Sequence, residues 1–385
     1  FPVSVRLGDP MTEDIDNPYL YYSGGKSIEA DDYTMFFGRQ DLIERIVQQL
    51  SEPYKGSCFV LYGQKRSGKT SVVYKIARQL PHNTIYSYVS AGSFNEHSQY
   101  ALGAMCVELY AAVKKQLETD YNLHMDFDIS DPMLTSLLKL NKIKEFLLDH
   151  KLSWVIAVDE FTHIYANKPE DTKKFMHAWK TFLEQKIFNA IIIGQDTMPQ
   201  FKRDYSNDFC VKMDERLSLL SKENTFKMAE QPILLNGKTR FKGNALDKVY
   251  ELTSGSPYFL QKLCSNIVDY MNERRSPYVT GADIDNIAET MVRGELRMQE
   301  EEFDGIISSG DKLNARFSED QLLPLLTKIA ISSLQLGWCP ISELFDIENY
   351  DAKIDDLVSR DTLEKNEQQV RIKAGLLSRW LRVNK

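Results

Sequence analysis

Residues 58–70 read Cys-Phe-Val-Leu-Tyr-Gly-Gln-Lys-Arg-Ser-Gly-Lys-Thr, an apolar run followed by a loop rich in glycine and cations. Cys58–Tyr62 has the length and composition of a buried strand. Gly63 to Thr70 matches the phosphate-binding pattern G-x-x-x-x-G-K-[ST] at every fixed position. An amphipathic helix is predicted over residues 70–80, directly after the loop. This order of strand, phosphate loop (P-loop) and helix predicts an α/β domain built around a phosphate site.

The loop contains the residue types that phosphate chemistry requires. Gly63 and Gly68 permit backbone angles that turn successive N–H groups toward phosphate oxygens. Lys69 brings a cation to the β- and γ-phosphates, and Thr70 offers a hydroxyl to Mg²⁺. The positive end of the following helix dipole adds to the attraction. We therefore predict a nucleoside triphosphate with Mg²⁺, held by Gly63, Gln64, Lys65, Arg66, Ser67, Gly68, Lys69, Thr70 and Ser71. Alternatively, Lys65 and Arg66 are exposed cations of the loop that do not contact the phosphates.

A second apolar run, residues 154–158, ends in the two acids Asp159 and Glu160. We expect a buried strand whose carboxyl end carries both carboxylates. Asp159 is predicted to hold Mg²⁺ through its water shell, and Glu160 to act as the general base on the attacking water. Solvated acids at a strand end are the plainer alternative. The P-loop upstream favours the magnesium and catalytic roles.

Polar residues follow the apolar run of residues 190–193 as well. Gln195 is predicted to sense the γ-phosphate from that strand's end, although an ordinary turn would also use a polar residue there. Lys69, Glu160 and Gln195 are thus the catalytic candidates. His163 lies one helical turn beyond Glu160 and is interpreted as a surface residue.

The apolar runs alternate with helical patterns, which predicts a parallel sheet covered on both faces. Strands are expected at residues 58–62, 84–89, 154–158 and 190–193. Helical patterns dominate after about residue 205, and a hairpin of residues 362–365 and 368–372 follows three further helices. The predicted division is an arm or linker (1–35), a nucleotide-binding α/β domain (36–205), a helical lid (206–305) and a winged helix (306–385).

Composition narrows the class of protein. The 385 residues carry a formal net charge of −8, so the whole chain is not a polyanion binder, although a local basic patch remains compatible. The five cysteines are scattered without a CxxC pair, which indicates reduced thiols in a cytoplasmic protein and argues against structural zinc. No apolar run approaches the ~18 residues of a membrane helix. No signal peptide is predicted, and the first residue, Phe1, is compatible with a portion of a longer chain.

Several motifs together resemble a known group. Phe36-Phe37-Gly38-Arg39, the P-loop, the Asp159-Glu160 strand and Gly255-Ser256-Pro257-Tyr258 occur in the order typical of STAND ATPases, the signal-transducing branch of the AAA+ superfamily that includes NACHT and NB-ARC proteins. Asn17-Pro18-Tyr19 is similar to the entry segment of bacterial members, and residues 370–382 are similar to their winged-helix terminus. The resemblance covers residues 17–385 and implies an AAA+-like parallel sheet, a helical lid and a winged helix.

The resemblance also implies site residues. Phe37, Gly38 and Arg39 would border the adenine and ribose of ATP or ADP, and Pro257 would close the base pocket from the lid. For Pro257 an ordinary helix start, with Ser256 as N-cap, is the alternative, and both can hold together.

The chain also departs from the family pattern. Leu42 stands where the family usually has Glu, and no histidine follows His177, so the winged-helix histidine that senses ADP in many relatives is absent or replaced. Arg203 and Arg216 are candidates for an arginine finger, although surface or structural roles suit both. Without a finger, hydrolysis is expected to be slow.

The leading hypothesis is an ATP-driven switch in which nucleotide exchange releases the winged helix and exposes a surface for self-association or an effector partner. Bacterial antiviral defence and transcriptional signalling are settings that the resemblance implies. The alternative is a DNA-binding AAA+ ATPase of the origin-recognition or transposition-regulator type. The net acidic charge of the expected recognition helix, residues 350–360, disfavours DNA. A third reading is a scaffold that binds nucleotide without turnover, which Glu160 argues against.

Overall fold

The computed structural model describes residues 13–28, 32, 34–94, 101–131, 133–294, 297–309 and 315–385. Within them, five parallel strands form one sheet in the order β2-β3-β4-β1-β5. The strands are β1 (Cys58–Tyr62), β2 (Thr84–Ser90), β3 (Ser153–Asp159), β4 (Asn189–Gly194) and β5 (Met213–Arg216). The four strands expected from the sequence are confirmed. We did not predict β5, because its sequence, Met-Asp-Glu-Arg, is polar and lies at the edge of the sheet.

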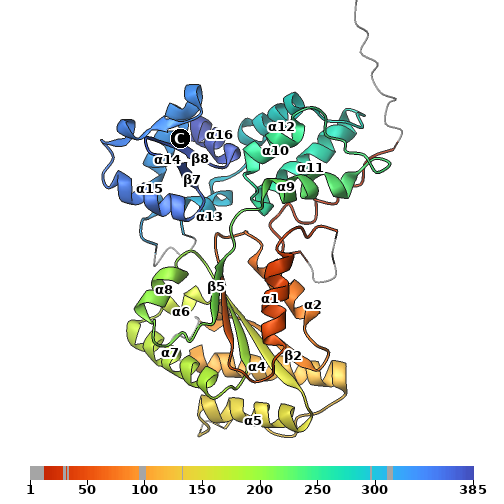
Figure 1. Ribbon diagram of the computed structural model, residues 1–385, viewed down its shortest axis with the longest axis vertical. Helices are drawn as coiled ribbons and strands as arrows, with labels where there is room; N and C mark the ends of the chain where they lie inside the picture. The colour runs from red at the N-terminus through yellow and green to blue at the C-terminus, as the bar shows by residue number, and fades with distance from the viewer. Residues whose placement is uncertain are drawn as a thin grey trace, which may run out of the picture.

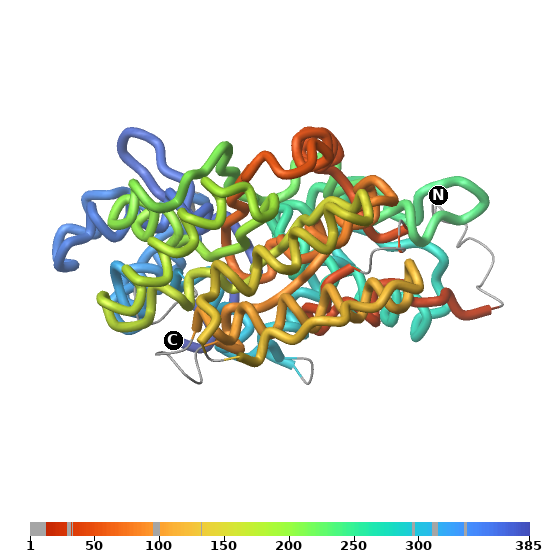
Figure 2. The backbone as a smooth tube through the Cα atoms, turned by 90° about the horizontal axis from the view of Figure 1, so that it is seen from below, coloured from red at the N-terminus to blue at the C-terminus, as the bar shows by residue number. Residues whose placement is uncertain are grey.

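Helices cover both faces of this sheet, which explains why its central strands are apolar throughout. Alternate residues of β1 enter different clusters: Phe59 and Leu61 pack toward α1 and α2, and Cys58 and Val60 pack toward the other helices. The first face carries α1 (Gln40–Leu50) and α2 (Lys69–Gln79). The second carries α3 (Ala91–Phe94), α4 (Ala101–Gln116), α5 (Ser136–Asp149), α6 (Thr162–Tyr165), α7 (Pro169–Glu184) and α8 (Met198–Asp204). Figure 2 shows α4 and α5, in orange and yellow, side by side on the near side of the molecule.

A helical region and a C-terminal region lie beside each other at one end of the sheet (Figure 1). The helical region consists of α9 (Lys222–Glu230), α10 (Ala245–Thr253), α11 (Pro257–Glu273) and α12 (Gly281–Arg293). The C-terminal region contains α13 (Asp304–Ile307), α14 (Glu319–Leu336), α15 (Tyr350–Ser359), α16 (Gly375–Asn384), β6 (Cys339–Pro340), β7 (Leu363–Lys365) and β8 (Gln369–Ile372). No helix among the described residues is both long and apolar enough to cross a membrane.

The C-terminal elements follow the order that we interpreted as a winged helix, with one difference. The second expected helix is a short 3₁₀ turn, Ile341–Leu344, after which β6 pairs antiparallel with β8. The predicted hairpin is confirmed as the antiparallel pair β7 and β8. Tilted rings of the helical and C-terminal regions also pack against one another, with centroids 5.3 Å apart for Phe259 and Phe303 and 5.1 Å apart for Phe303 and Trp380. The apolar core is therefore continuous across the boundary expected near residue 305.

The described part of the expected N-terminal arm is packed rather than extended into solvent. Tyr19 is fully buried against the helical region, and its hydroxyl donates to the carbonyl of Ala229 at 2.7 Å. Further along, the Ile28 N–H donates to Ser71 Oγ at 2.9 Å, which joins the arm to the start of α2. Residues 1–12, 29–31 and 33, which also belong to the predicted arm, lie outside the residues that the structure describes. The arm thus spans from the helical region to the P-loop helix.

Candidate functional site

The P-loop joins the end of β1 to the start of α2 at Lys69. Gly63 has a φ of 146°, and a Cβ atom there would lie 2.7 Å from the carbonyl oxygen of Leu217. Gly68 has a φ of 88°, in the range that favours glycine. The two fixed glycines of the sequence pattern therefore stand where the backbone needs them, and the loop is turned, not extended.

The Lys69 side chain folds over this loop. Its Nζ donates to the carbonyl oxygens of Gly63 at 3.0 Å and Gln64 at 2.7 Å. Burial lowers the pKa of Lys69 to about 8, although the carboxylates of Asp196 and Asp159 act in the opposite direction. A polyphosphate bound at the loop would supply the negative charge that this half-buried ammonium group needs.

Thr70 and Asp159 meet although 89 positions separate them in the sequence. The Thr70 hydroxyl donates to Asp159 Oδ2 at 3.1 Å, since the carboxyl end of β3 lies beside the start of α2. Tyr88, on the neighbouring β2, also donates to Asp159 Oδ2, at 2.5 Å. Burial, aided by the Asp159 carboxylate, raises the pKa of Tyr88 far above its usual value, so the phenol remains a donor that orients this acid. A hydroxyl and a carboxylate oxygen fit the hard-oxygen preference of Mg²⁺, which keeps most of its water ligands in such sites.

Glu160 points to a different partner from its neighbour. Its backbone has a φ of 52°, a left-handed conformation that is uncommon outside glycine. The Ser90 hydroxyl, at the end of β2, donates to Glu160 Oε2 at 2.7 Å. The Asp159 carboxylate thus faces α2. The Glu160 carboxylate is exposed to water and lies at the carboxyl end of β2, beside Ser90.

Gln195 and Asp196 follow the end of β4. The carbonyl of Gln195 accepts a hydrogen bond from the Met198 N–H at 2.9 Å, where α8 begins. The Asp196 side chain is 4% exposed, and Arg216 Nε donates to its Oδ1 at 2.9 Å. Asp196 therefore acts electrostatically on Lys69 together with Asp159, and sequence reasoning passed it over in favour of Gln195.

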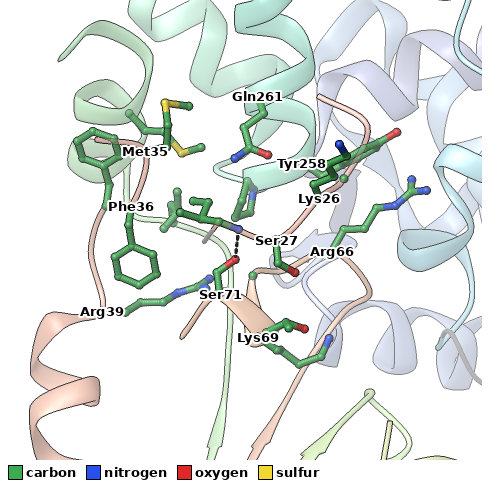
Figure 3. A pocket seen from close by; sticks show the side chains of 18 residues that line it. Lys26, Ser27, Met35, Phe36, Arg39, Arg66, Lys69, Ser71, Tyr258 and Gln261 are labelled. Atoms are coloured by element: carbon green, nitrogen blue, oxygen red, sulfur yellow. Dashed lines mark hydrogen bonds between the residues drawn. The ribbon is translucent and has the colours of Figure 1, made fainter. Parts of the chain in front are cut away.

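A cavity of about 160 Å³ adjoins the P-loop (Figure 3). Its apolar wall comes from the arm, the segment before α1 and the helical region, and consists of Ile28, Met35, Phe36, Phe37, Leu220, Met228 and Pro257. Of the residues expected at the nucleotide, those that line it are Phe37, Arg39, Arg66, Gly68, Lys69, Thr70, Ser71 and Pro257. Gly38 does not line it, since this glycine packs against the Asn224 side chain. The cavity joins an apolar slot to the phosphate loop, as a nucleotide requires.

A family model described as novel STAND NTPase 1 matches residues 22–251. The chain belongs to this STAND NTPase family. It is a P-loop NTPase whose sheet and helices are similar to those of solved ATPases. A Walker-type ATPase of Pyrococcus abyssi has a TM-score of 0.60 and 14% identity, over 93% of this chain and 99% of that one. The Aeropyrum pernix ORC2 protein, solved as ADPNP–ADP complexes, has a TM-score of 0.56 and 11% identity, over 92% and 96%. These two likenesses concern the fold alone. Comparison with curated proteins finds no match.

The outer side of the P-loop of this STAND NTPase contacts the C-terminal half of the chain. Gln64, which is buried, donates from Nε2 to the carbonyl of Arg360. The Arg66 guanidinium lies over the Tyr258 ring, 4.2 Å from its centroid, and donates to the Glu302 carbonyl at 3.4 Å. Lys65 is exposed. Gln64, Lys65 and Ser67 therefore line a crevice toward residues 301–306 and not the nucleotide cavity.

Arg39 holds the P-loop from the other side. Its Nη1 donates to the Ser67 carbonyl at 2.8 Å and its Nη2 to the Ser218 carbonyl at 2.9 Å. Burial lowers the pKa of Arg39 to about 10. This arginine ties the segment before α1 to the phosphate loop. The two finger candidates differ: Arg203 is exposed on α8, and Arg216 is bound by carboxylates.

Several cavity residues were missed by sequence reasoning. Gln261 and Tyr258 follow Pro257 on α11, and the four-residue spacing from Pro257 to Gln261 could have identified the latter as a neighbour on the same helix face. Residues 25–28 carry no motif, and only the fold shows that they close the cavity.

Proposed function

We propose that this chain is an ATP-driven switch that binds Mg-ATP, hydrolyses it slowly and uses nucleotide exchange to control the docking of its C-terminal region. The observation that carries this proposal is the position of Arg216 at the end of β5. Its guanidinium binds Asp196, beside the P-loop lysine, and also Asp361, in the loop between α15 and β7. One side chain therefore joins the nucleotide site to the C-terminal region.

The ion pairs of Arg216 are buried enough to contribute to stability. The side chains of Arg216, Asp196 and Asp361 are 19%, 4% and 20% exposed, and Lys373 Nζ adds a second cation 2.6 Å from Asp361. Burial alone would lower the pKa of Arg216, but Asp196 and Asp361 raise it above its usual value. Loss of one partner would leave a buried charge unpaired, which is costly.

A second contact connects the phosphate loop to the same C-terminal segment. Lys69 binds the carbonyl of Gln64, and the Gln64 side chain binds the carbonyl of Arg360, next to Asp361. A γ-phosphate that draws Lys69 away from the loop carbonyls would alter both this contact and the balance of charge at Asp196. Moving such an equilibrium from 1:99 to 99:1 needs ~5.5 kcal/mol of differential binding, of which charged hydrogen bonds supply ~1.5–3 kcal/mol each.

Hydrolysis is proposed to use the two acids at the end of β3. Thr70 and Asp159 would hold Mg²⁺, which would supply positive charge for the phosphates, and Glu160 would accept the proton of the attacking water. Slow turnover follows from the arginines. Among the described residues, Arg216 is committed to two carboxylates and Arg203 is exposed on α8. A finger worth ~10³–10⁵ in rate is thus left to a partner molecule.

DNA binding is disfavoured by the surface of α15. Its basic residues are internal: Lys353 is 8% exposed, and Arg360, directly after the helix, is 3% exposed and donates to Asp356 at 2.9 Å. Asp351 and Asp355 are exposed instead. A partner protein or a second copy of the chain is the proposed binder of the released region, in the cytoplasm, where the five free cysteines would remain reduced. Antiviral defence or transcriptional signalling is the proposed setting.

Thermal unfolding in the presence of Mg-ATP and Mg-ADP tests the binding part of this proposal. At ~100 times Kd, either nucleotide should add ~2.7 kcal/mol to the free energy of unfolding. Removal of Mg²⁺ with EDTA should reduce the gain with ATP. An unfolding curve that neither nucleotide moves would refute the proposal.

A further inference from the structure

Gln261 is a buried amide to which the described residues supply no hydrogen bond. It lies on α11, one turn after Pro257, and is 4% exposed, yet its side chain has no hydrogen-bond partner among the described residues. Figure 3 shows the Gln261 carboxamide directed from the helix into the cavity, with Phe36 on one side of it and Tyr258 on the other. Buried polar groups are paired as a rule, so an unpaired one that faces a cavity indicates a partner from outside the chain.

Another buried amide shows what the fold does when no ligand is involved. Asn189, at the start of β4, donates to the carbonyls of Leu50 at 3.1 Å and Glu52 at 2.8 Å. Its oxygen accepts from the Ser57 N–H at 3.0 Å. The donor and the acceptor of the Asn189 side chain are therefore used for structure, whereas no described residue uses those of Gln261.

The other uncharged polar side chains around the cavity are largely committed. Thr70 donates to Asp159, Ser71 accepts from the Ile28 N–H, and Tyr258 donates to Glu302 at 2.7 Å. Apart from Gln261, the remaining uncharged polar side chain among the described residues that line the cavity is Ser27, which is half-exposed. Gln261 is thus the buried group that can read a ligand, among the apolar walls and away from the phosphate loop.

We infer that Gln261 reads the base of the nucleotide and selects adenine over guanine. This rests on the proposed binding of a nucleoside triphosphate at the same site. A carboxamide presents one donor and one acceptor side by side, which match the exocyclic amine of adenine and its adjacent ring nitrogen. The phosphate loop fixes the other end of the ligand, so the apolar slot must hold the base.

Guanine fits this wall less well. Its N7 and O6 are both acceptors, so one of them would be left without a donor from Gln261 on that edge, and pairing through O6 and N1–H instead would bury the adjacent 2-amino group. Its 2-amino group is a further donor that would need an acceptor. The described residues that line the cavity include four cations, Lys26, Arg39, Arg66 and Lys69, but no carboxylate. A buried amine without an acceptor disfavours guanine on the other edge.

Two substitutions at position 261 test this inference. Gln261→Met keeps the length and the apolar packing but removes both hydrogen bonds. It should weaken Mg-ATP binding about tenfold, in the range expected for one bidentate base contact, and bring the affinities for ATP and GTP close together. Gln261→Glu offers two acceptors, which match the N1–H and 2-amino donors on the other edge of guanine, so it should favour GTP over ATP. Asn266→Ala is the matched control, because Asn266 lies on the same helix and donates to the helix carbonyl of Lys262 at 2.8 Å.

Dissociation constants for Mg-ATP, Mg-GTP and Mg-ITP, measured by calorimetry on all four proteins, provide the readout. ITP lacks the 2-amino group, so wild-type affinity should fall in the order ATP, ITP, GTP. The inference is overturned if Gln261→Met retains the wild-type ratio of ATP to GTP affinity, or if wild type binds GTP as tightly as ATP. Absence of binding of all three to wild type would overturn the proposed function as well, whereas an unchanged ratio in a protein that binds ATP overturns this inference alone.

Discussion

The phosphate end and the base end of the nucleotide site are built in different ways. The phosphate end comes from one continuous loop, Gly63 to Thr70, and the tip of one strand that carries Asp159. The base end is assembled from four separate segments of the chain, around residues 25–28, 35–37, 220–228 and 257–261. The first is encoded locally and is expected to supply affinity. The second depends on tertiary packing and is expected to supply selectivity and the response of the helical region.

Turnover is expected to show the largest effect, at the phosphate end. Glu160→Gln should lower the rate of ATP hydrolysis ~10²–10⁴-fold, since it removes the general base, while Mg-ATP still binds. Steady-state phosphate release and calorimetric binding, measured on the same protein, separate the two effects. Ser90→Ala, which removes the hydroxyl that holds Glu160, is the milder companion. Unchanged turnover in Glu160→Gln would assign the base to another residue.

Affinity provides the second comparison within one loop. Lys69→Ala should weaken Mg-ATP binding about 100-fold or more. The lysine is expected to make several charged hydrogen bonds to the phosphates, and each one that is removed costs ~1.5–3 kcal/mol of binding free energy. Lys65→Ala removes an exposed cation of the same loop and should change the affinity little. Equal losses in the two variants would mean that the loop attracts phosphate by general charge, against the geometry around Lys69.

The two ends also differ in what the sequence could predict. The P-loop and Asp159 were predictable because their spacing and residue types are set by phosphate and Mg²⁺ chemistry. Gln261 and residues 25–28 belong to no motif, and their role follows from packing that joins distant segments. The polar edge strand β5 was missed for a related reason: its hydrogen bonds to β1, and not its own composition, make it a strand. The 145 positions between Arg216 and Asp361 likewise put that contact beyond any local pattern.

The connection from the site to the C-terminal region provides a third, smaller effect. Arg216→Ala and Asp361→Asn, combined in a double-mutant cycle, should show a coupling of ~0.5–3 kcal/mol in the free energy of unfolding, because the two groups share one partly buried contact. Either variant should also increase hydrogen exchange in residues 360–373. Asp355→Asn removes an exposed carboxylate nearby and serves as the control. Additive effects of the pair would separate Arg216 from the docking of this region.

The smallest expected effect is a pH dependence of ATP binding. The pKa of Lys69 is lowered to about 8, and bound phosphate should raise it again by favouring the charged form. Below pH 8 the amino group of Lys69 is already protonated, so ATP binding takes up only a small fraction of a proton there. At pH 9 binding should take up nearly one proton at Lys69, and affinity should fall up to about tenfold per pH unit above 8. Calorimetry in buffers of different ionisation enthalpy measures this uptake, which should disappear in Lys69→Met. Uptake that persists in that variant would place the proton elsewhere.

The central claim is that nucleotide at the phosphate end decides whether the C-terminal region stays docked. It is tested most directly by pulsed EPR distances between spin labels on the exposed Lys173 of α7 and the exposed Glu367 of the β7–β8 turn, both replaced by cysteine in a chain whose exposed Cys210 is replaced by serine. With Glu160→Gln to prevent turnover, we predict one narrow distance distribution in Mg-ADP and a longer, broader one in Mg-ATP. Superimposable distributions under saturating ADP and ATP would contradict the account.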